Sequence, residues 1–276
     1  MALLLEYFEK ELEYRTGIHF DSYNPDYLLN RIRERMLKLG VEDKEDYLAE
    51  IRTDQDEADA LLRSIGLNVS EFFRDSFTYE TLEKQIVPGV LWQKAGDGVK
   101  ELRIWSAGCA SGEEPYSLAI LLDRLLRRQL EEWQINIFAT DINSENLSAA
   151  RRGIYDVERL QEVKLGVLQE YFEPAGERYR IKDQIRNMVN FSLEDITTTK
   201  RYAPAESIFG SFDLILCRNV LIYFNSKARE RTLNTLARAL STGGYLVLGG
   251  SEWMNAESAK LFTRMDKRNR IFVKVP

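Results

Sequence analysis

The stretch RIWSAGCASGEEPYSLAI, residues 103–120, decides the fold of this 276-residue chain. It begins as a short apolar run, passes through small residues, and becomes acidic at Glu113 and Glu114, where a helix is expected to begin. A strand, a tight loop and a helix in this order are typical of the first unit of an open parallel sheet. Phosphate-binding loops in such folds carry a G-x-G-x-x-G pattern or a Lys, because backbone N–H groups and basic side chains attract anions. This loop has neither, so a dinucleotide or a nucleoside triphosphate is a poor candidate ligand.

The composition of the chain excludes several classes of protein. Its 38 Lys and Arg residues against 44 Asp and Glu residues, with a formal net charge of −6, give no overall reason to bind nucleic acid. The longest apolar run, residues 116–126, contains Asp123 and is too short to span a membrane, and the first residues lack the basic start of a secretory signal. Cys109 and Cys217 are not at metal-ligand or disulfide spacing and are expected to be buried, reduced thiols. We therefore expect a cytoplasmic protein with no metal, no nucleic-acid partner and no membrane insertion.

The chain divides into a helical part and a part in which strands and helices alternate. Asn24 and Pro25 are typical of a helix start and Gly40 of a helix end, and further helices are expected at residues 44–51, 57–65 and 75–93. After residue 100, short apolar runs alternate with helical patterns, which indicates a parallel sheet with crossover helices. The expected strands are 102–106, 135–140, 188–192, 212–217, 245–248 and 271–275, and the expected helices are 113–130, 144–152 and 226–240.

One connection in the second part is too long for an ordinary crossover loop. Within residues 153–186, the stretch RYRIKD (178–183), followed by IRNMVNF (185–191), is typical of a β-hairpin. We therefore predict a helical domain over residues 1–82 and a sheet domain over residues 83–276, with an insertion at about residues 154–187.

The polar residues that follow the strands predict the ligand, because ligands of open parallel sheets bind beyond the carboxyl ends of the strands. The acidic pair at the start of the first helix favours a cationic group such as an amino-acid ammonium, although acidic residues also stabilise a helix N-terminus on their own. Asp141 ends the second strand, where it is placed to accept hydrogen bonds from ribose hydroxyls; the alternative is a helix cap, but Asn143 and Ser144 fill that role. An adenosine joined to an amino acid without phosphate is S-adenosylmethionine.

Five stretches along the chain carry a resemblance to a known family: NVSEFFRD (68–75), WSAGCASGEEPYSLA (105–119), FATDINSENLSAARRGIYD (138–156), VNFSLEDI (189–196) and CRNVLIYF (217–224). In these stretches the chain resembles the CheR-type methyltransferases, which methylate glutamates of bacterial and archaeal chemoreceptors. The resemblance implies an α/β fold with a Rossmann-like class I methyltransferase sheet, an N-terminal all-helical domain and a small β-hairpin insertion. It also implies methyl transfer from S-adenosylmethionine to glutamate carboxylates of the receptors' cytoplasmic methylation helices, with S-adenosylhomocysteine as the product.

The resemblance also implies which residues hold the cofactor. Asn68, Ser70 and Arg74 would reach it from the helical side, and Ser70 stands where the family has a threonine. Spacing alone leaves open which acid of the first helix faces the cofactor, and the resemblance favours the second. The other implied contacts are Glu114 to the ammonium, Asp141 to the ribose, Asp195 and Ile196 to the adenine, and Arg218 and Asn219 after the fourth strand.

Two further groups of residues are expected to act on the substrate. Arg74 and Tyr223 are expected beside the transferred methyl group, where Arg74 holds a carboxylate and Tyr223 donates a hydrogen bond; the alternative is that Tyr223 packs behind the sheet. Arg31, Arg35 and Lys38 share one face of a helix and are expected to dock the acidic receptor helices, with a merely solvated surface as the alternative.

The functional prediction is therefore a monomeric protein-glutamate O-methyltransferase. Two alternatives stay open at this point. One is a methyltransferase that acts on a different acceptor, and the other is a signalling module that binds the cofactor without catalysis.

Overall fold

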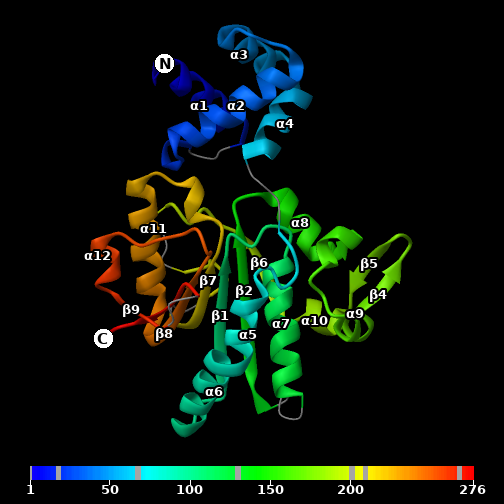
Figure 1. Cartoon of the computed structure of the whole chain (residues 1–276), viewed down its shortest axis with the longest axis vertical. Helices are drawn as coiled ribbons and strands as arrows, with labels where there is room; N and C mark the ends of the chain where they lie inside the picture. Colours follow the sequence, from blue (N-terminus) through cyan, green and yellow to red (C-terminus); the bar gives the residue numbers. More distant parts are fainter. Residues whose placement is uncertain are drawn as a thin grey trace.

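The computed structural model describes residues 2–16, 20–65, 70–127, 132–198, 203–207, 211–265 and 269–276. The first part of the chain is a separate helical domain beyond one end of the sheet, drawn in blue in Figure 1. Its helices are α1 (Ala2–Thr16), α2 (Pro25–Leu39), α3 (Lys44–Thr53) and α4 (Gln55–Ile65). Among the described residues, no helix combines the length and the apolar character needed to cross a membrane.

Helix α2 begins and ends where the sequence predicts. The Asn24 side chain accepts a hydrogen bond from the backbone N–H of Asp26, Pro25 occupies the first helical position, and Gly40 ends the helix with φ 71°. Its apolar face is buried in a core that the four helices share. This core supplies the stability that short helices lack on their own.

The second part of the chain is a seven-stranded sheet in the order β6-β2-β1-β7-β8-β10-β9. The five strands from β6 to β8 are parallel, and β10 and β9 are antiparallel. The strand order reverses between β1 and β7, and this reversal places a crevice at their carboxyl ends. The strands are β1 (Glu101–Ala107), β2 (Gln134–Asp141), β6 (Val189–Leu193), β7 (Phe212–Cys217), β8 (Leu240–Leu248), β9 (Phe262–Arg264) and β10 (Ile271–Lys274).

Helices cover both faces of this sheet (Figure 1) and make two separate cores. One core contains α7 (Glu113–Leu126) and α8 (Ser144–Arg152), and the other contains α11 (Ser226–Ala239). The first core also takes in α5 (Ser76–Thr81), a π-helical segment (Leu82–Ile86) and α6 (Val87–Gly96). These layers give the predicted α/β architecture. The small helix α12 (Ala256–Ala259) lies near the C-terminus.

The described core residues favour a domain boundary earlier than the predicted one after residue 82. The core of the helical domain ends at Ile65, whereas Phe72, Tyr79 and Leu82 are all buried in a core of the sheet domain. The buried contacts therefore place the boundary between residues 65 and 72.

The insertion contains a small antiparallel sheet, but its hairpin differs from the predicted one. Residues 178–181 pair antiparallel with the preceding residues 172–175, through a turn at Gly176 with φ 69°. Residues 183–186 are helical. Pairing of 178–183 with 185–191 was therefore the wrong prediction, because residues 189–193 belong to the main sheet. The elements are β3 (Ile154–Tyr155), α9 (Leu165–Tyr171), β4 (Phe172–Ala175), β5 (Arg178–Ile181) and α10 (Asp183–Arg186).

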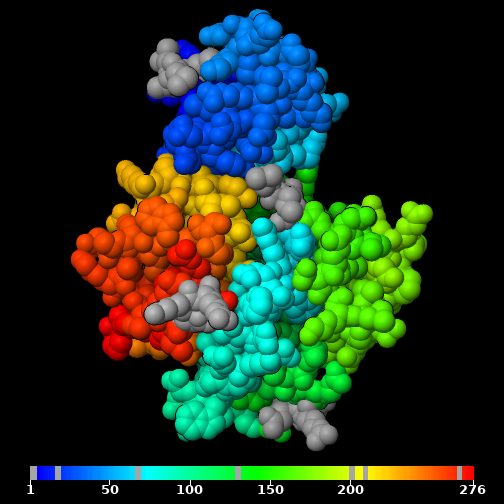
Figure 2. Space-filling model, viewed as in Figure 1, coloured from blue at the N-terminus to red at the C-terminus, as the bar shows by residue number. Residues whose placement is uncertain are grey.

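The helical domain contacts the sheet domain through an antiparallel bridge between Tyr23 and Phe224. The backbone N–H of Asn24 donates to the carbonyl of Tyr223 at 2.8 Å, and the N–H of Asn225 donates to the carbonyl of Ser22 at 3.0 Å. Figure 2 shows the blue domain seated on the yellow segment that contains residues 223–225. We call this contact, residues 21–24 with residues 223–225, the interdomain seam.

Candidate active site

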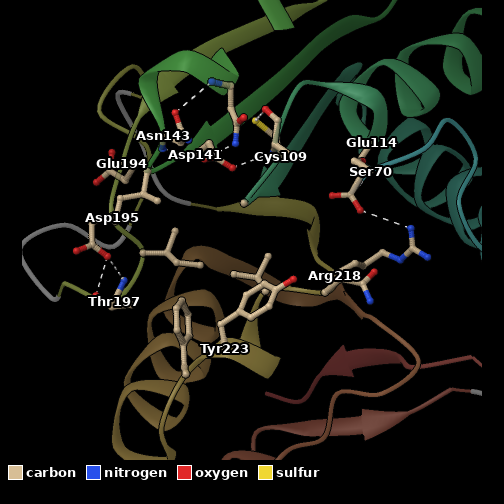
Figure 3. A pocket seen from close by; sticks show the side chains of 18 of the residues that line it. Ser70, Cys109, Glu114, Asp141, Asn143, Glu194, Asp195, Thr197, Arg218 and Tyr223 are labelled. Atoms are coloured by element: carbon tan, nitrogen blue, oxygen red, sulfur yellow. Dashed lines mark hydrogen bonds and ion pairs between the residues drawn. The ribbon is translucent and has the colours of Figure 1, made fainter. Parts of the chain in front are cut away.

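A pocket lies at the carboxyl ends of the parallel strands, between the two domains (Figure 3). Asn68 was also predicted to bind the cofactor, but it lies outside the described residues. The other predicted cofactor and methyl-transfer residues all line this pocket: Ser70, Arg74, Glu114, Asp141, Asp195, Ile196, Arg218, Asn219 and Tyr223.

The loop after β1 is packed too closely to carry larger side chains. A Cβ atom on Gly108, which has φ 78°, would lie 2.4 Å from a methyl group of Val220. The backbone N–H groups of Gly108 and Cys109 donate to the carbonyl of Thr140 at 2.8 and 2.9 Å, so the loop is fixed to the end of β2. The small residues of this loop therefore let the backbone itself form a wall of the pocket.

Asp141 lies between the loops that follow β1 and β2 and faces the pocket. Its carboxylate accepts hydrogen bonds from the backbone N–H groups of Ala110 and Asn143, both at 2.8 Å. Asn143, not Asp141, caps α8 by accepting from Glu145 and Asn146. Because burial is the dominant effect, the pKa of Asp141 is raised. The cap alternative for Asp141 is thus excluded by geometry.

The two acids at the start of α7 have different surroundings. Glu114 lines the pocket, accepts a hydrogen bond from the hydroxyl of Ser106 at 2.7 Å and lies 3.5 Å from the guanidinium of Arg218. Glu113 is fully buried outside the pocket lining, where it accepts from the hydroxyl of Ser111 at 2.9 Å. Burial raises the pKa of both carboxyl groups. Of the two acids, only Glu114 is placed to meet a ligand.

Arg218 connects the pocket to the segment that enters it from the helical side. Its guanidinium donates to the carbonyl of Arg74 at 2.8 Å and lies 3.4 Å from the Asp75 carboxylate. It also lies 5.7 Å from the ring centroid of Tyr79. Arg218 is thus a buried crosslink between β7 and residues 74–75, in addition to being a lining residue.

Left-handed backbone conformations gather around this pocket. Among the described residues, five other than glycine have positive φ, and four of these lie at the pocket or beside it. They are Phe73 (φ 55°), Asp75 (φ 65°), Ala110 (φ 47°) and Asn219 (φ 60°). Such conformations cost free energy and persist where surrounding contacts impose them, as at binding sites.

The order of polar groups along the pocket fits S-adenosylmethionine. Asp195 and Thr197 lie at one end and Glu114 and Arg218 at the other, with Asp141 between them (Figure 3). This is the order in which an adenine, a ribose and an amino-acid group follow one another in that molecule. The described lining carries five acids against two arginines and no lysine, which favours a ligand with a cationic group over one with a pyrophosphate. The acids are Glu71, Glu114, Asp141, Glu194 and Asp195.

Tyr223 is half-buried, and its hydroxyl points into the pocket (Figure 3). Its ring centroid lies 5.0 Å from that of Tyr27 in the helical domain. Burial raises the pKa of Tyr223, which keeps the phenol protonated and able to donate a hydrogen bond, whereas the charge of Arg74 acts in the opposite direction. The alternative that Tyr223 packs behind the sheet does not match this position.

The three basic residues of α2 that were predicted to dock the receptor do not line the pocket, and one of them is held inside the helical domain. The guanidinium of Arg35 binds both carboxylate oxygens of Glu57, which also accepts from the hydroxyl of Tyr47 at 2.6 Å. The predicted docking role of Arg35 is therefore corrected to a structural link between α2 and α4. Arg31 pairs with the neighbouring Glu34 at 2.8 Å, and Lys38 is exposed.

Sequence reasoning missed two residues that shape the site. Tyr23 lines the pocket from the helical domain, and its ring lies 5.8 Å from that of Phe224. Glu252 is buried behind Asn219 and contacts backbone N–H groups of the loop after β7. Neither has a local motif, although an acid so soon after the predicted strand 245–248 was a signal for Glu252.

Comparisons with known proteins agree with this geometry. Residues 4–65 match the family described as CheR methyltransferase, all-alpha domain, and residues 68–271 match CheR methyltransferase, SAM binding domain. A chemotaxis protein methyltransferase 1 of Pseudomonas aeruginosa is 34% identical over 91% of this chain and 90% of its own length. A chemotaxis protein methyltransferase of Listeria innocua is 32% identical over 89% of this chain and 88% of its own.

A third relative is much longer than this chain. An uncharacterized 104.1 kDa protein of Rhodobacter capsulatus is 32% identical over 92% of this chain, which spans only 26% of that protein's length. Among solved structures, magnesium protoporphyrin IX methyltransferase from Synechocystis PCC 6803 with bound SAM covers 69% of this chain and 77% of its own at 15% identity, with a TM-score of 0.35, a weak likeness. The matches to both domain models confirm S-adenosylmethionine as the cofactor, and the chain belongs to the CheR methyltransferase family.

Proposed function

We propose that the protein methylates glutamate side chains in the cytoplasmic methylation helices of chemoreceptors and releases S-adenosylhomocysteine. The observation that carries the proposal is the row of Asp195, Asp141 and Glu114 in one pocket, in a chain whose relatives are named chemotaxis protein methyltransferases. The receptor is proposed as the acceptor because the family acts on receptor glutamates.

The residues that would hold the cofactor are the row of Asp195, Asp141 and Glu114, together with lining residues such as Ser70 and Arg74. Glu114 would bind the ammonium, Asp141 the ribose hydroxyls, and Asp195 with Ile196 the adenine edge. When bound, S-adenosylmethionine would supply a methyl group activated by its sulfonium: the acceptor carboxylate oxygen would bond to the methyl carbon as the carbon–sulfur bonding pair goes to sulfur, with S-adenosylhomocysteine as the leaving group. The carboxylates of Glu114 and Asp141 are buried and line the pocket, where they would accept hydrogen bonds from the ammonium and hydroxyl donors of this ligand.

The acceptor needs positioning and desolvation more than acid–base chemistry. A glutamate side chain is ionised at neutral pH, so no general base is required. Arg74 would hold the acceptor carboxylate, and the Tyr223 hydroxyl would donate one hydrogen bond to it. The apolar wall beside them, Val220 and Phe224, would displace water from the nucleophile and so leave it more reactive.

The proposal is tested by incubating the protein with radiolabelled S-adenosylmethionine and membranes that contain chemoreceptors. The expected result is label on the receptor that is released as methanol in mild alkali, because carboxyl methyl esters hydrolyse there and N-methyl groups do not. A receptor with its methylated glutamates replaced by alanine is the matched control. Stable label would indicate a different acceptor, and cofactor binding without transfer to any fraction would indicate a sensing module.

A further inference from the structure

Glu252 lies in a nest of backbone N–H groups behind the pocket, with 2% of its surface exposed. Its Oε1 atom accepts from the N–H groups of Val220 at 2.8 Å and Leu221 at 2.7 Å. Its Oε2 atom accepts from Asn219 at 3.1 Å and Gly249 at 2.5 Å. One carboxylate therefore joins the loop after β7 to the loop after β8.

The two loops direct four backbone N–H donors toward one acceptor at this position. Asn219 has φ 60°, and this conformation turns the N–H groups of residues 219–221 toward one point, where they attract negative charge. Gly249 leaves the necessary space, because a Cβ atom there would lie 2.9 Å from both the Asn219 nitrogen and the Glu252 Oε2 atom. The Glu252 carboxylate can reach these N–H groups because residue 249 is a glycine and has no side chain in the way.

The loop that Glu252 holds carries much of the candidate active site. Arg218, Asn219, Val220 and Tyr223 all line the pocket, whereas Glu252 does not. We propose that Glu252 is a positioning residue, which fixes residues 218–223 in the conformation that binds the cofactor and presents Tyr223. This inference rests on the proposed function, because it assigns Glu252 a part in the same cofactor site.

The first test measures S-adenosylhomocysteine binding by calorimetry for the whole chain and its Glu252→Gln variant. Glutamine has one acceptor oxygen, and its amide NH₂ would face N–H donors, so at least part of the nest loses its partner. We expect binding to weaken by about 10- to 100-fold, as when other outer-shell partners are removed. The control is Glu257→Gln, which changes an exposed acid of α12 that pairs with Lys260 just after that helix, and we expect it to bind normally.

A second pair of variants keeps the test valid if the glutamine variant does not fold. Gly249→Ala adds one methyl group between Asn219 and Glu252, whereas Gly250→Ala adds one where no atom lies within 4 Å. Neither glycine has a left-handed φ, so both changes probe space rather than backbone strain. We expect the first to weaken S-adenosylhomocysteine binding by about 10-fold or more and the second to leave it unchanged.

A double-mutant cycle separates positioning from general loosening. If Glu252 acts by orienting Asn219, the Asn219→Ala change weakens binding less in the Glu252→Gln background than in the natural chain. Additive effects in folded variants, or a Glu252→Gln variant that binds within about threefold of the natural chain, would overturn the inference. A natural chain that does not bind S-adenosylhomocysteine would instead overturn the proposed function.

Discussion

Replacing Glu114 by glutamine tests the assignment of the ammonium site directly. The side chain is 12% exposed, so solvent screens its charge little. A hydrogen bond between a buried carboxylate and a charged group contributes about 1.5–3 kcal/mol, which corresponds to about 10- to 150-fold in affinity. We therefore expect Glu114→Gln to weaken S-adenosylhomocysteine binding in calorimetry by about that factor.

The same change should have a smaller effect on the stability of the ligand-free protein. Arg218 keeps its bond to the Arg74 carbonyl at 2.8 Å and its contact with Asp75 at 3.4 Å when the charge of Glu114 is removed. Removing a buried charge whose pKa is raised also relieves its desolvation cost. Thermal unfolding without ligand checks this expectation.

The neighbouring acid provides the matched control. Glu113→Gln retains an oxygen that accepts from the Ser111 hydroxyl, and the residue lies outside the pocket lining. We expect its binding to stay within about threefold of the natural chain. Equal losses in the Glu113 and Glu114 variants, or no loss in the Glu114 variant, would refute the reasoning.

Further outcomes are expected for Tyr223, for changes of pH and for the basic residues of α2. Tyr223→Phe should lower kcat by about tenfold at saturating cofactor while leaving S-adenosylhomocysteine affinity nearly unchanged, and a natural kcat in initial-rate measurements would contradict its role. The two pocket carboxylates have raised pKa values, so the ligand-free folded chain binds more protons than the unfolded chain: its stability should fall as pH rises from the unfolded values, about 4, through the folded ones. Because the ligand needs these groups ionised, the thermal shift that it causes should grow over the same range, and a pH-independent shift would exclude this linkage. Charge reversal of Arg31 and Lys38 should weaken receptor methylation and its salt dependence. Arg35→Ala should instead cost about 1.5–3 kcal/mol of unfolding free energy, because Glu57 loses its cationic partner and keeps the hydrogen bond from Tyr47. Methylation at several salt concentrations checks the first result, and chemical denaturation checks the second.

Sequence reasoning located the central strands because each is a buried apolar run with a local signal. The stretch from β1 to α7 follows from its own residues: an apolar strand, small loop residues and an acidic helix start. β9 was not predicted, because it has three residues, of which only Phe262 is buried, and its pairing with β10 decides its conformation. The wrong hairpin has a similar cause, since alternation identifies a strand but not its partner.

The sequence predicts those site residues that lie at or just after strand ends. It does not predict those whose role depends on a contact with a residue far away in the sequence. Asp141 and Glu114 follow strands, so topology alone brings them together. Arg31 and Arg35 are four residues apart on one face of a helix, so spacing does not distinguish their roles. Only the contact of Arg35 with Glu57, 22 residues away, gives Arg35 a structural role. Glu252 follows a predicted strand, but the loop that it binds lies 31 to 33 residues earlier, and no local pattern identifies that partner.

The segment from Arg218 to Asn225 is held at both of its ends, and each end uses a different part of the chain. Glu252 binds the N–H groups at its start, and the interdomain seam fixes its end, where the Asn225 side chain also donates to the carbonyl of Asp21 at 2.8 Å. Tyr223 follows the residues that Glu252 holds and is itself part of the seam, and its ring centroid lies 5.0 Å from that of Tyr27 in α2.

The seam gives the helical domain a direct part in building the site. Tyr27, whose ring packs against that of Tyr223, also contacts Arg31: the Arg31 guanidinium lies 5.4 Å from the ring centroid of Tyr27. The helix face proposed for receptor docking is therefore separated from the pocket hydroxyl by a single aromatic ring. The sheet domain supplies Tyr223, and packing against Tyr27 of α2 limits where that side chain points. We therefore expect the helical domain to help set the geometry of the pocket.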